Sequence, residues 1–316
     1  MKWNTLSQLL AGLTCFICAA IANAGGSLSF QNYSHGCLDQ QAISDTTTTI
    51  YRGSSVEPAL AVNPINPNHI VAAWMQDRCS NGSASEIGIA YSADGGQLWR
   101  NTIIPYQICM GGITQRVGDP WLSYSADGSK LYFMACVVNA TPIAGTTTQS
   151  GIVVTTSLNN GATWNAPYYL NKSSWYFREP TGLFPNLDKN AITADPNNAL
   201  NAIGVYAEFN PSSGYHSTAQ SNITRNGANT WTAPTLVYDP FPDLNNTGLS
   251  NGIENDNSVN NNQVVILPKT NPSYPLSCTG DWLNFACRIY AKPGATDQQF
   301  MDDWFPRQYT LSLIHI

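Results

Sequence analysis

Three tryptophans divide much of the chain into units of nearly equal length. Trp99, Trp164 and Trp231 are 65 and 67 residues apart. Around each of them, short runs rich in β-branched and aromatic residues alternate with clusters of Asn, Asp, Gly and Pro. Runs of this kind predict strands joined by tight turns, and a fixed period of this length predicts a structural unit that is repeated along the chain.

The repeat therefore predicts an all-β fold. Four strands fit into each unit, and four-stranded antiparallel units repeated around an axis are typical of a β-propeller. A β-sandwich with coincidental spacing is the alternative. About four blades fit into the chain, six are expected in a complete protein, and the expected blades are residues 56–105, 119–170, 188–238 and 253–310.

The turn before each tryptophan carries a recurring motif. Residues 92–99 and 157–164 read Ser-x-Asp/Asn-x-Gly-x-x-Trp, and residues 224–231 are a weaker copy with the glycine one place early. The motif resembles the Asp-box, also called the bacterial neuraminidase repeat, of secreted sialidase-like propellers. In that family the box is a hairpin turn opposite the substrate face. The residues with this structural role are then Ser92, Asp94, Gly96, Trp99, Ser157, Asn159, Gly161, Trp164, Asn226 and Trp231.

Acidic residues recur near the start of the first expected strand of each unit. Because equivalent positions converge on the axis of a propeller, we expect them to form an arc of carboxylates at the channel mouth. Paired carboxylates can serve as acid and base in glycoside hydrolysis, and guanidinium groups can bind a sugar carboxylate. The candidate catalytic residues are Glu57, Asp77, Asp119 and Asp188, and the candidate substrate-binding residues are Arg78, Arg116, Arg178 and Glu208.

The resemblance implies a glycoside hydrolase of the exo-α-sialidase type that acts on extracellular glycans or glycoproteins. Sialidases begin with an Arg-Ile-Pro motif, whereas the matching stretch here is Val56-Glu57-Pro58. A propeller that binds glycans or proteins without turnover is therefore the alternative. The acidic residues could also be simple turn formers paired with nearby donors. No cofactor or metal is expected, although clustered carboxylates also suit a cation such as Ca²⁺.

The first 24 residues predict export. Lys2 precedes an apolar stretch, residues 9–22, and a small-residue cleavage site at Ala22 and Ala24. This pattern is typical of a signal peptide, and the stretch is too short for a membrane span. We therefore expect a secreted or periplasmic protein with an N-terminal segment at residues 25–55. With Lys+Arg 14 against Asp+Glu 20 and no basic run, we expect neither nucleic acid nor a membrane as partner.

Six cysteines remain after the signal peptide, which in an exported chain predicts up to three disulfides. Cys278 with Cys287 is the first expected pair, and Cys79 with Cys109 the second. Residues 311–316 fit no strand, and we expect them to be a non-native tail after a truncation of the reading frame.

Overall fold

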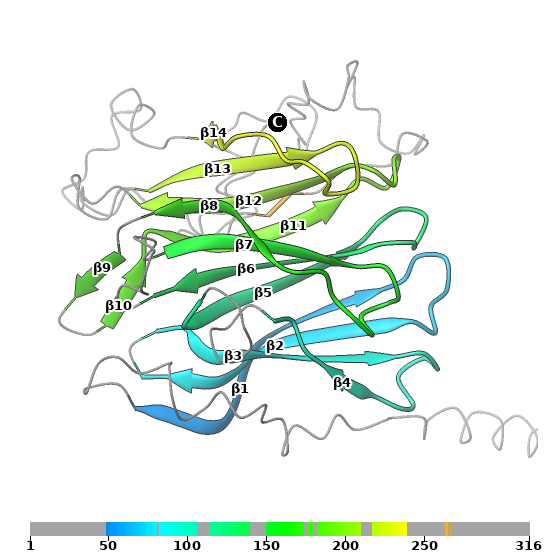
Figure 1. Ribbon diagram of the computed structural model, residues 1–316, viewed down its shortest axis with the longest axis horizontal. Coiled ribbons are helices and arrows are strands. Elements are labelled where there is room, and N and C mark those ends of the chain that lie inside the picture. The colour runs from blue at the N-terminus through cyan, green and yellow to red at the C-terminus, as the bar shows by residue number, and fades with distance from the viewer. Residues whose placement is uncertain are drawn as a thin grey trace, which may run out of the picture.

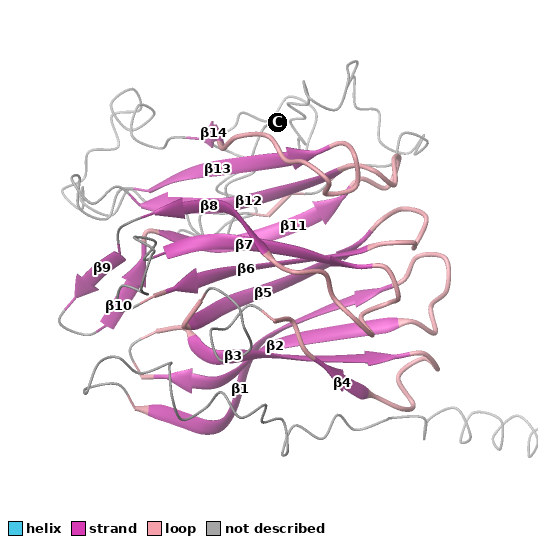
Figure 2. Cartoon of the chain, in the orientation of Figure 1, coloured by secondary structure: helices cyan, strands magenta, loops and turns pink. Residues whose placement is uncertain are grey.

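The structure is a computed structural model. It describes residues 49–80, 82–105, 114–139, 150–173, 176–179, 182–209, 217–238, 263–264 and 266. The expected signal peptide, most of the N-terminal segment, most of the fourth blade and the C-terminal tail lie outside these residues. Figure 2 shows that the described part consists of strands and loops without a helix. Accordingly, no described helix is long and apolar enough to cross a membrane.

The strands form three consecutive antiparallel meanders of four strands each (Figure 1), and a single residue pair, Ala84 with Val117, joins the first two meanders at one end. We call them the first, second and third sheets. The first sheet contains β1 (Ile50–Val62), β2 (Ile70–Cys79), β3 (Ala84–Ser92) and β4 (Arg100–Thr102). The second contains β5 (Arg116–Tyr124), β6 (Leu131–Val138), β7 (Ser150–Ser157) and β8 (Tyr168–Ser173). The third contains β11 (Leu187–Ala194), β12 (Ala202–Phe209), β13 (Ser217–Thr224) and β14 (Thr235–Tyr238).

This arrangement confirms the expected all-β class with four antiparallel strands in each of the three described repeats. The first sheet begins at Ile50, inside the segment that we had assigned to the N-terminal region. One feature was not expected. A hairpin of β9 (Tyr176–Glu179) and β10 (Gly182–Pro185) lies between the second and third sheets in the chain, so Arg178 is on a strand rather than in a loop.

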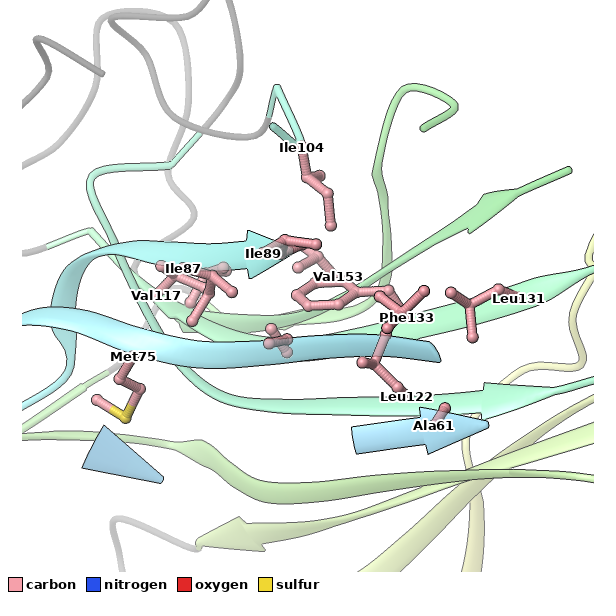
Figure 3. Close-up of a cluster of buried hydrophobic side chains, with 14 of the residues drawn as sticks. Ala61, Met75, Ile87, Ile89, Ile104, Val117, Leu122, Leu131, Phe133 and Val153 are labelled. Carbon is pink, nitrogen blue, oxygen red and sulfur yellow. The ribbon is translucent and has the colours of Figure 1, made fainter. Parts of the chain in front are cut away.

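The sheets are held together by apolar faces that meet between them. The core between the first two sheets combines Met75, Ile87 and Ile89 with Val117, Phe133 and other residues of the second sheet. Figure 3 shows these side chains pointing into the space between the two sheets. A second core joins the second and third sheets in the same way. Both faces of β6 are buried, because Phe133 and Ala135 belong to the first core and Tyr132 and Met134 to the second. A strand buried on both faces is expected to be apolar throughout.

The tryptophans that mark the repeat belong to these cores. Trp164 packs against the core between the first and second sheets, where its ring meets Phe133 edge-on at a centroid distance of 5.9 Å. Trp231 packs against the core between the second and third sheets. Trp99 lies against Ala72, Trp74 and Ala90, all within its own sheet. The spacing of the tryptophans therefore reflects the spacing of the sheets.

Candidate functional site

The first strand of every sheet is interrupted at one equivalent place. The register with the second strand shifts between Val56 and Ala59, between Gly118 and Trp121, and between Asp188 and Ala191. Within these bulges Glu57, Asp119 and Lys189 have left-handed φ angles of 52°, 51° and 49°. This conformation is unfavourable for residues other than glycine. The left-handed conformation occurs at the equivalent position of all three sheets. We therefore take these three positions as the centre of a candidate site.

The three bulges line one cleft of about 500 Å³. β1 contributes Glu57 to Leu60, β5 contributes Asp119 to Leu122, and β11 contributes Lys189 and Asn190. Gln263, from the described residues after the third sheet, completes the lining. The first strands of successive sheets therefore meet at this cleft. Glu57 and Asp119 come together here, as expected from their equivalent positions in the repeat. A cleft of this size at the meeting of several elements is the usual place for a small-molecule site.

Two carboxyl groups meet in this cleft. The carboxyl group of Asp119 interacts directly with that of Glu57, and this interaction together with partial burial raises the pKa of Glu57 from 4.5 to about 7. Two carboxylates cannot hydrogen-bond to each other unless one of them keeps its proton. The raised pKa of Glu57 is therefore the expected consequence of placing the two groups side by side, although Glu57 itself is exposed at the cleft.

Lys189 completes the charge balance of the pair. Its Nζ lies 3.2 Å from Oδ2 of Asp119. Burial alone would lower the pKa of Lys189, but the nearby Asp119, Asp188 and Glu57 outweigh it and raise the pKa. The ammonium group therefore stays charged and neutralises the shared negative charge of the carboxyl pair.

Behind the cleft lies a second, more enclosed group. Carboxylate oxygens of Asp119 and Asp188 and the sulfur of Cys136 all lie within 4.8 Å of one another. Burial, followed by the charge of Asp119, raises the pKa of Asp188 from 3.8 to about 7, and burial raises that of the Cys136 thiol. These atoms could ligate a metal ion, but Lys189 already supplies a positive charge at Asp119.

Asp188 is thus not the equivalent of Glu57 and Asp119, as we had expected. It precedes the bulge, and Lys189 occupies the equivalent position. Asp188 does not line the cleft, whereas Lys189 does. The sequence contained a signal for the correct alignment. Glu57, Asp119 and Lys189 each stand six residues before the residue that opens the first turn, which is Asn63, Ser125 and Asp195, respectively.

Asp77 lies away from the cleft. It is 2% exposed, and its Oδ1 accepts hydrogen bonds from the Gly53 backbone and from Nε2 of Gln76, both at 2.7 Å. Its φ is 58°. These bonds tie β2 to the start of β1, where Gly53 also has a positive φ of 78°. The geometry therefore gives Asp77 a role in shaping the strands, in place of the catalytic role that we had expected.

The expected substrate-binding residues do not gather at the cleft either. Nη1 of Arg78 donates to the backbone carbonyls of Cys79 and Ser83, and its charge lowers the pKa of Glu57 only as a minor influence. Arg116 is 1% exposed. Glu208 is half-buried on β12, where burial raises its pKa, and it does not line the cleft. The side chain of Arg178 lies outside the described residues.

The expected pairing of Cys79 with Cys109 is also wrong in this structure. Cys79 is a free, buried thiol, as is Cys136. Burial raises the pKa of Cys79. Cys37, Cys109, Cys278 and Cys287 lie outside the described residues.

The three turns that carry the repeated motif share one hydrogen-bond pattern. In the first, Oγ of Ser92 accepts from the Gly96 backbone at 2.9 Å, and Oδ1 of Asp94 accepts from the Leu98 backbone at 2.9 Å. The equivalent bonds join Ser157 to Gly161 and Asn159 to Thr163, and Thr224 to Ala228 and Asn226 to Thr230. All three turns lie at the right of Figure 1. None of their residues lines the cleft, which fits a structural role.

Sequence reasoning overlooked two further residues of the cleft. Trp121 follows the Asp119–Pro120 bulge and forms part of the wall. Asn190 is 4% exposed, and its Nδ2 donates to the Asp119 backbone carbonyl at 3.0 Å. Its Oδ1 has no hydrogen-bond partner among the described residues. Both residues directly follow a bulge. Aligning the three units by their bulges, instead of by their acidic residues, would therefore have identified them.

Comparison with known proteins gives a likeness at the level of structure. No family model and no curated protein matches the chain. A Hadza microbial sialidase aligns with a TM-score of 0.42 at 15% identity over 60% of this chain and 39% of its own. An inhibitor complex of Trypanosoma rangeli sialidase aligns with a TM-score of 0.39 at 18% identity, over 59% of this chain and 32% of its own. An arabinobiose complex of Penicillium chrysogenum α-L-arabinanase aligns with a TM-score of 0.39 at 17% identity, over 58% of this chain and 49% of its own.

The chain thus spans between about a third and a half of the length of these three proteins. Because all three TM-scores are below 0.5, we base the function on the geometry of the cleft.

Proposed function

We propose that the cleft between β1, β5 and β11 binds an extracellular glycan and that the protein is a glycoside hydrolase. The observation that supports this most strongly is the interacting pair of Glu57 and Asp119 in an open cleft. General acids work best when their pKa is close to the working pH. A carboxyl group with a pKa of about 7 is protonated often enough at neutral pH to donate a proton.

Each carboxyl group then has a distinct task. Glu57, which is exposed, donates its proton to the glycosidic oxygen as the bond from that oxygen to the anomeric carbon breaks. Asp119, whose Oδ2 lies 3.2 Å from Nζ of Lys189, stabilises the positive charge that develops on the sugar. Water adds its hydroxyl to the anomeric carbon, and its second proton returns to Glu57.

The remaining wall of the cleft suits a sugar. Trp121, Leu60 and the two bulge prolines, Pro58 and Pro120, present apolar surface, and Asn190 and Gln263 present amides. The faces of a sugar ring carry C–H groups that pack against apolar and aromatic surfaces, while its hydroxyls need hydrogen-bond partners. Export through the N-terminal signal sequence, which we also propose, would bring the protein to extracellular glycans and glycoproteins.

The fold that we propose for the whole protein is a sialidase-like propeller with Asp-box turns. Contacts between successive sheets recur at fixed separations, which supports a rotational repeat. Asn63 bonds to Asn160 and Lys130 to Gly227, and both pairs are 97 residues apart. Thr102 bonds to Ala162 and Tyr168 to Ala228, 60 residues apart in each case. Single-particle images of the purified protein should show a ring, and an open stack of sheets would contradict it.

The experiment that tests the hydrolase uses a panel of oligosaccharides and the full chain. We expect release of sugar at pH 6–7 and a loss of about 10²–10⁴-fold in Glu57→Gln, which cannot donate the proton. Glu208→Gln is the matched control, because Glu208 is a half-buried carboxyl outside the cleft, and it should keep the activity. A protein that releases no sugar, or equal rates in both variants, would contradict the hydrolase.

Glycan binding without turnover is the second candidate, and one observation favours it. The carboxyl groups of retaining glycosidases are about 5 Å apart and those of inverting enzymes about 6.5–9.5 Å apart, whereas the carboxyl groups of Glu57 and Asp119 interact directly with each other. A bound sugar would have to separate them before hydrolysis. Binding of a glycan with no release of sugar would select this function.

A further inference from the structure

We infer that the cleft takes a neutral sugar rather than a sugar that carries a carboxylate, because Lys189, the one cation among its described lining residues, is already paired with Asp119. This inference rests on the proposed glycan site and specifies its substrate class. A sialic acid, which the resemblance to sialidases would suggest, is thereby disfavoured.

The cations near the cleft can be followed one by one. Lys189 is the one cation among the described residues that line it, and its ammonium is bound to Asp119. Arg78, at the far end of β2, directs Nη1 to two backbone carbonyls. Arg116 is almost fully buried. A carboxylate on the sugar would therefore find no described guanidinium placed to bind it in the two-pronged manner that such groups favour.

The charges within the cleft also cancel. Lys189, the positive group of the cleft, is already paired with the carboxylate of Asp119 at 3.2 Å, and the carboxyl group of Glu57 lies beside them. An anionic sugar would lose part of its hydration on entering this cleft without gaining a counter-charge, which is unfavourable. It would also compete with Asp119 for Lys189. A neutral sugar avoids both costs.

The uncharged groups of the cleft offer what a neutral sugar needs. Oδ1 of Asn190 is buried and has no hydrogen-bond partner among the described residues, although buried acceptors are nearly always paired. Asn190 lines the cleft, so a sugar hydroxyl can donate to this oxygen. Trp121 supplies the aromatic surface beside it.

The test is a glycan array in which every neutral glycan is paired with a counterpart that carries sialic acid or a uronic acid. We expect the full chain to bind the neutral member at least about tenfold more tightly, which corresponds to roughly one unfavourable charge interaction in a partly solvated site. Equal or tighter binding of the acidic member would overturn the inference and leave the glycan site standing. Binding of neither member would overturn both.

A variant tests the cause of the preference. Asp119→Asn removes the carboxylate that pairs with the Lys189 ammonium and keeps the left-handed backbone, which asparagine tolerates well. The ratio of acidic to neutral binding should rise about tenfold in Asp119→Asn and return to the wild-type value when Lys189→Gln is added. An unchanged ratio in Asp119→Asn would overturn the explanation. Since the ratio is taken within each protein, a general loss of affinity does not affect it.

Discussion

Glu57 and Asp119 lie at the same bulge of two successive sheets, 62 residues apart in the chain, and their carboxyl groups interact in one cleft. Each has a left-handed backbone, at φ of 52° and 51°. The repeat thus creates the site, because it brings one strained position from each sheet to the same cleft. Lys189, the third member, has the opposite charge and turns an acidic cluster into a balanced one.

Stability should fall as the pH rises from about 4 to about 7. Folding raises the pKa of Glu57 from 4.5 to about 7 and that of Asp188 from 3.8 to about 7. The folded state therefore binds more protons than the unfolded chain in this window, and raising the pH favours unfolding. Urea midpoints at about pH 5 and pH 7.5 check this. The slope should be smaller in Glu57→Gln, and a higher midpoint at pH 7.5 in the wild type would contradict the assignment.

The third motif turn should become more stable with glycine. Ala228 occupies the place of Gly96 and Gly161, and its φ of 70° is left-handed. Because this conformation is unfavourable for alanine, Ala228→Gly should raise the free energy of unfolding by about 0.5–1 kcal/mol. Thermal or urea denaturation measures the change, and a loss of stability would be the contrary result.

The other two turns provide matched substitutions in the opposite direction. Gly96→Ala should destabilise the protein by about 1 kcal/mol, since a Cβ there meets no atom nearer than 3.7 Å and only the backbone is strained. Gly161→Ala should cost about 1–3 kcal/mol more, because its Cβ would lie 2.8 Å from Cγ2 of Val71 in the neighbouring sheet. Equal losses would mean that the second turn does not pack against the first sheet.

Asn63 should be a strong contact between sheets. Its buried Nδ2 donates to the Gly128 carbonyl at 2.9 Å and to Oδ1 of Asn160 at 2.8 Å, both in the second sheet. Asn63→Ala leaves these acceptors unpaired and should lower the free energy of unfolding by about 2 kcal/mol. Asn66→Ala, an exposed neighbour in the same turn, should change it by less than about 0.5 kcal/mol. Similar values for the two would contradict the contact.

The two described cysteines should resist labelling. Cys79 and Cys136 are buried thiols with raised pKa values, so the reactive thiolate is both scarce and inaccessible. Peptide mapping after alkylation at about pH 8 should find them modified only when the protein is unfolded. Recovery of Cys79 linked to Cys109 would contradict the free thiol.

Much of the fold could be predicted from the sequence, because a repeat reports the same information several times. The spacing of Trp99, Trp164 and Trp231 predicted the three described sheets. The Ser, Asp or Asn, and Gly residues at fixed places in the motif predicted the turns. The convergence of Glu57 and Asp119 followed from their equivalent positions. These features depend on local turn chemistry and on strand period, both of which are visible in a single chain.

The errors arose where the backbone departs from regular strands. A bulge adds a residue to one strand, so an alignment by acidic residues chose Asp188 where the structure places Lys189. Asp77 was chosen as a candidate catalytic residue because of its charge. In the structure its Oδ1 accepts a hydrogen bond from the Gly53 backbone, where the register of β1 with β2 shifts. The hairpin of β9 and β10 lies between two units and carries none of the repeated motifs, so the spacing of the repeat did not predict it.

The most direct test of the site follows the carboxyl carbon of Glu57 by NMR during a pH titration of the wild type and of Asp119→Asn. We predict a pKa of about 7 in the wild type and a value closer to the ordinary 4.5 once the carboxyl of Asp119 is replaced. Titration of wild-type Glu57 near 4.5, with no change in the variant, would show that the two carboxyl groups do not interact and would contradict the account.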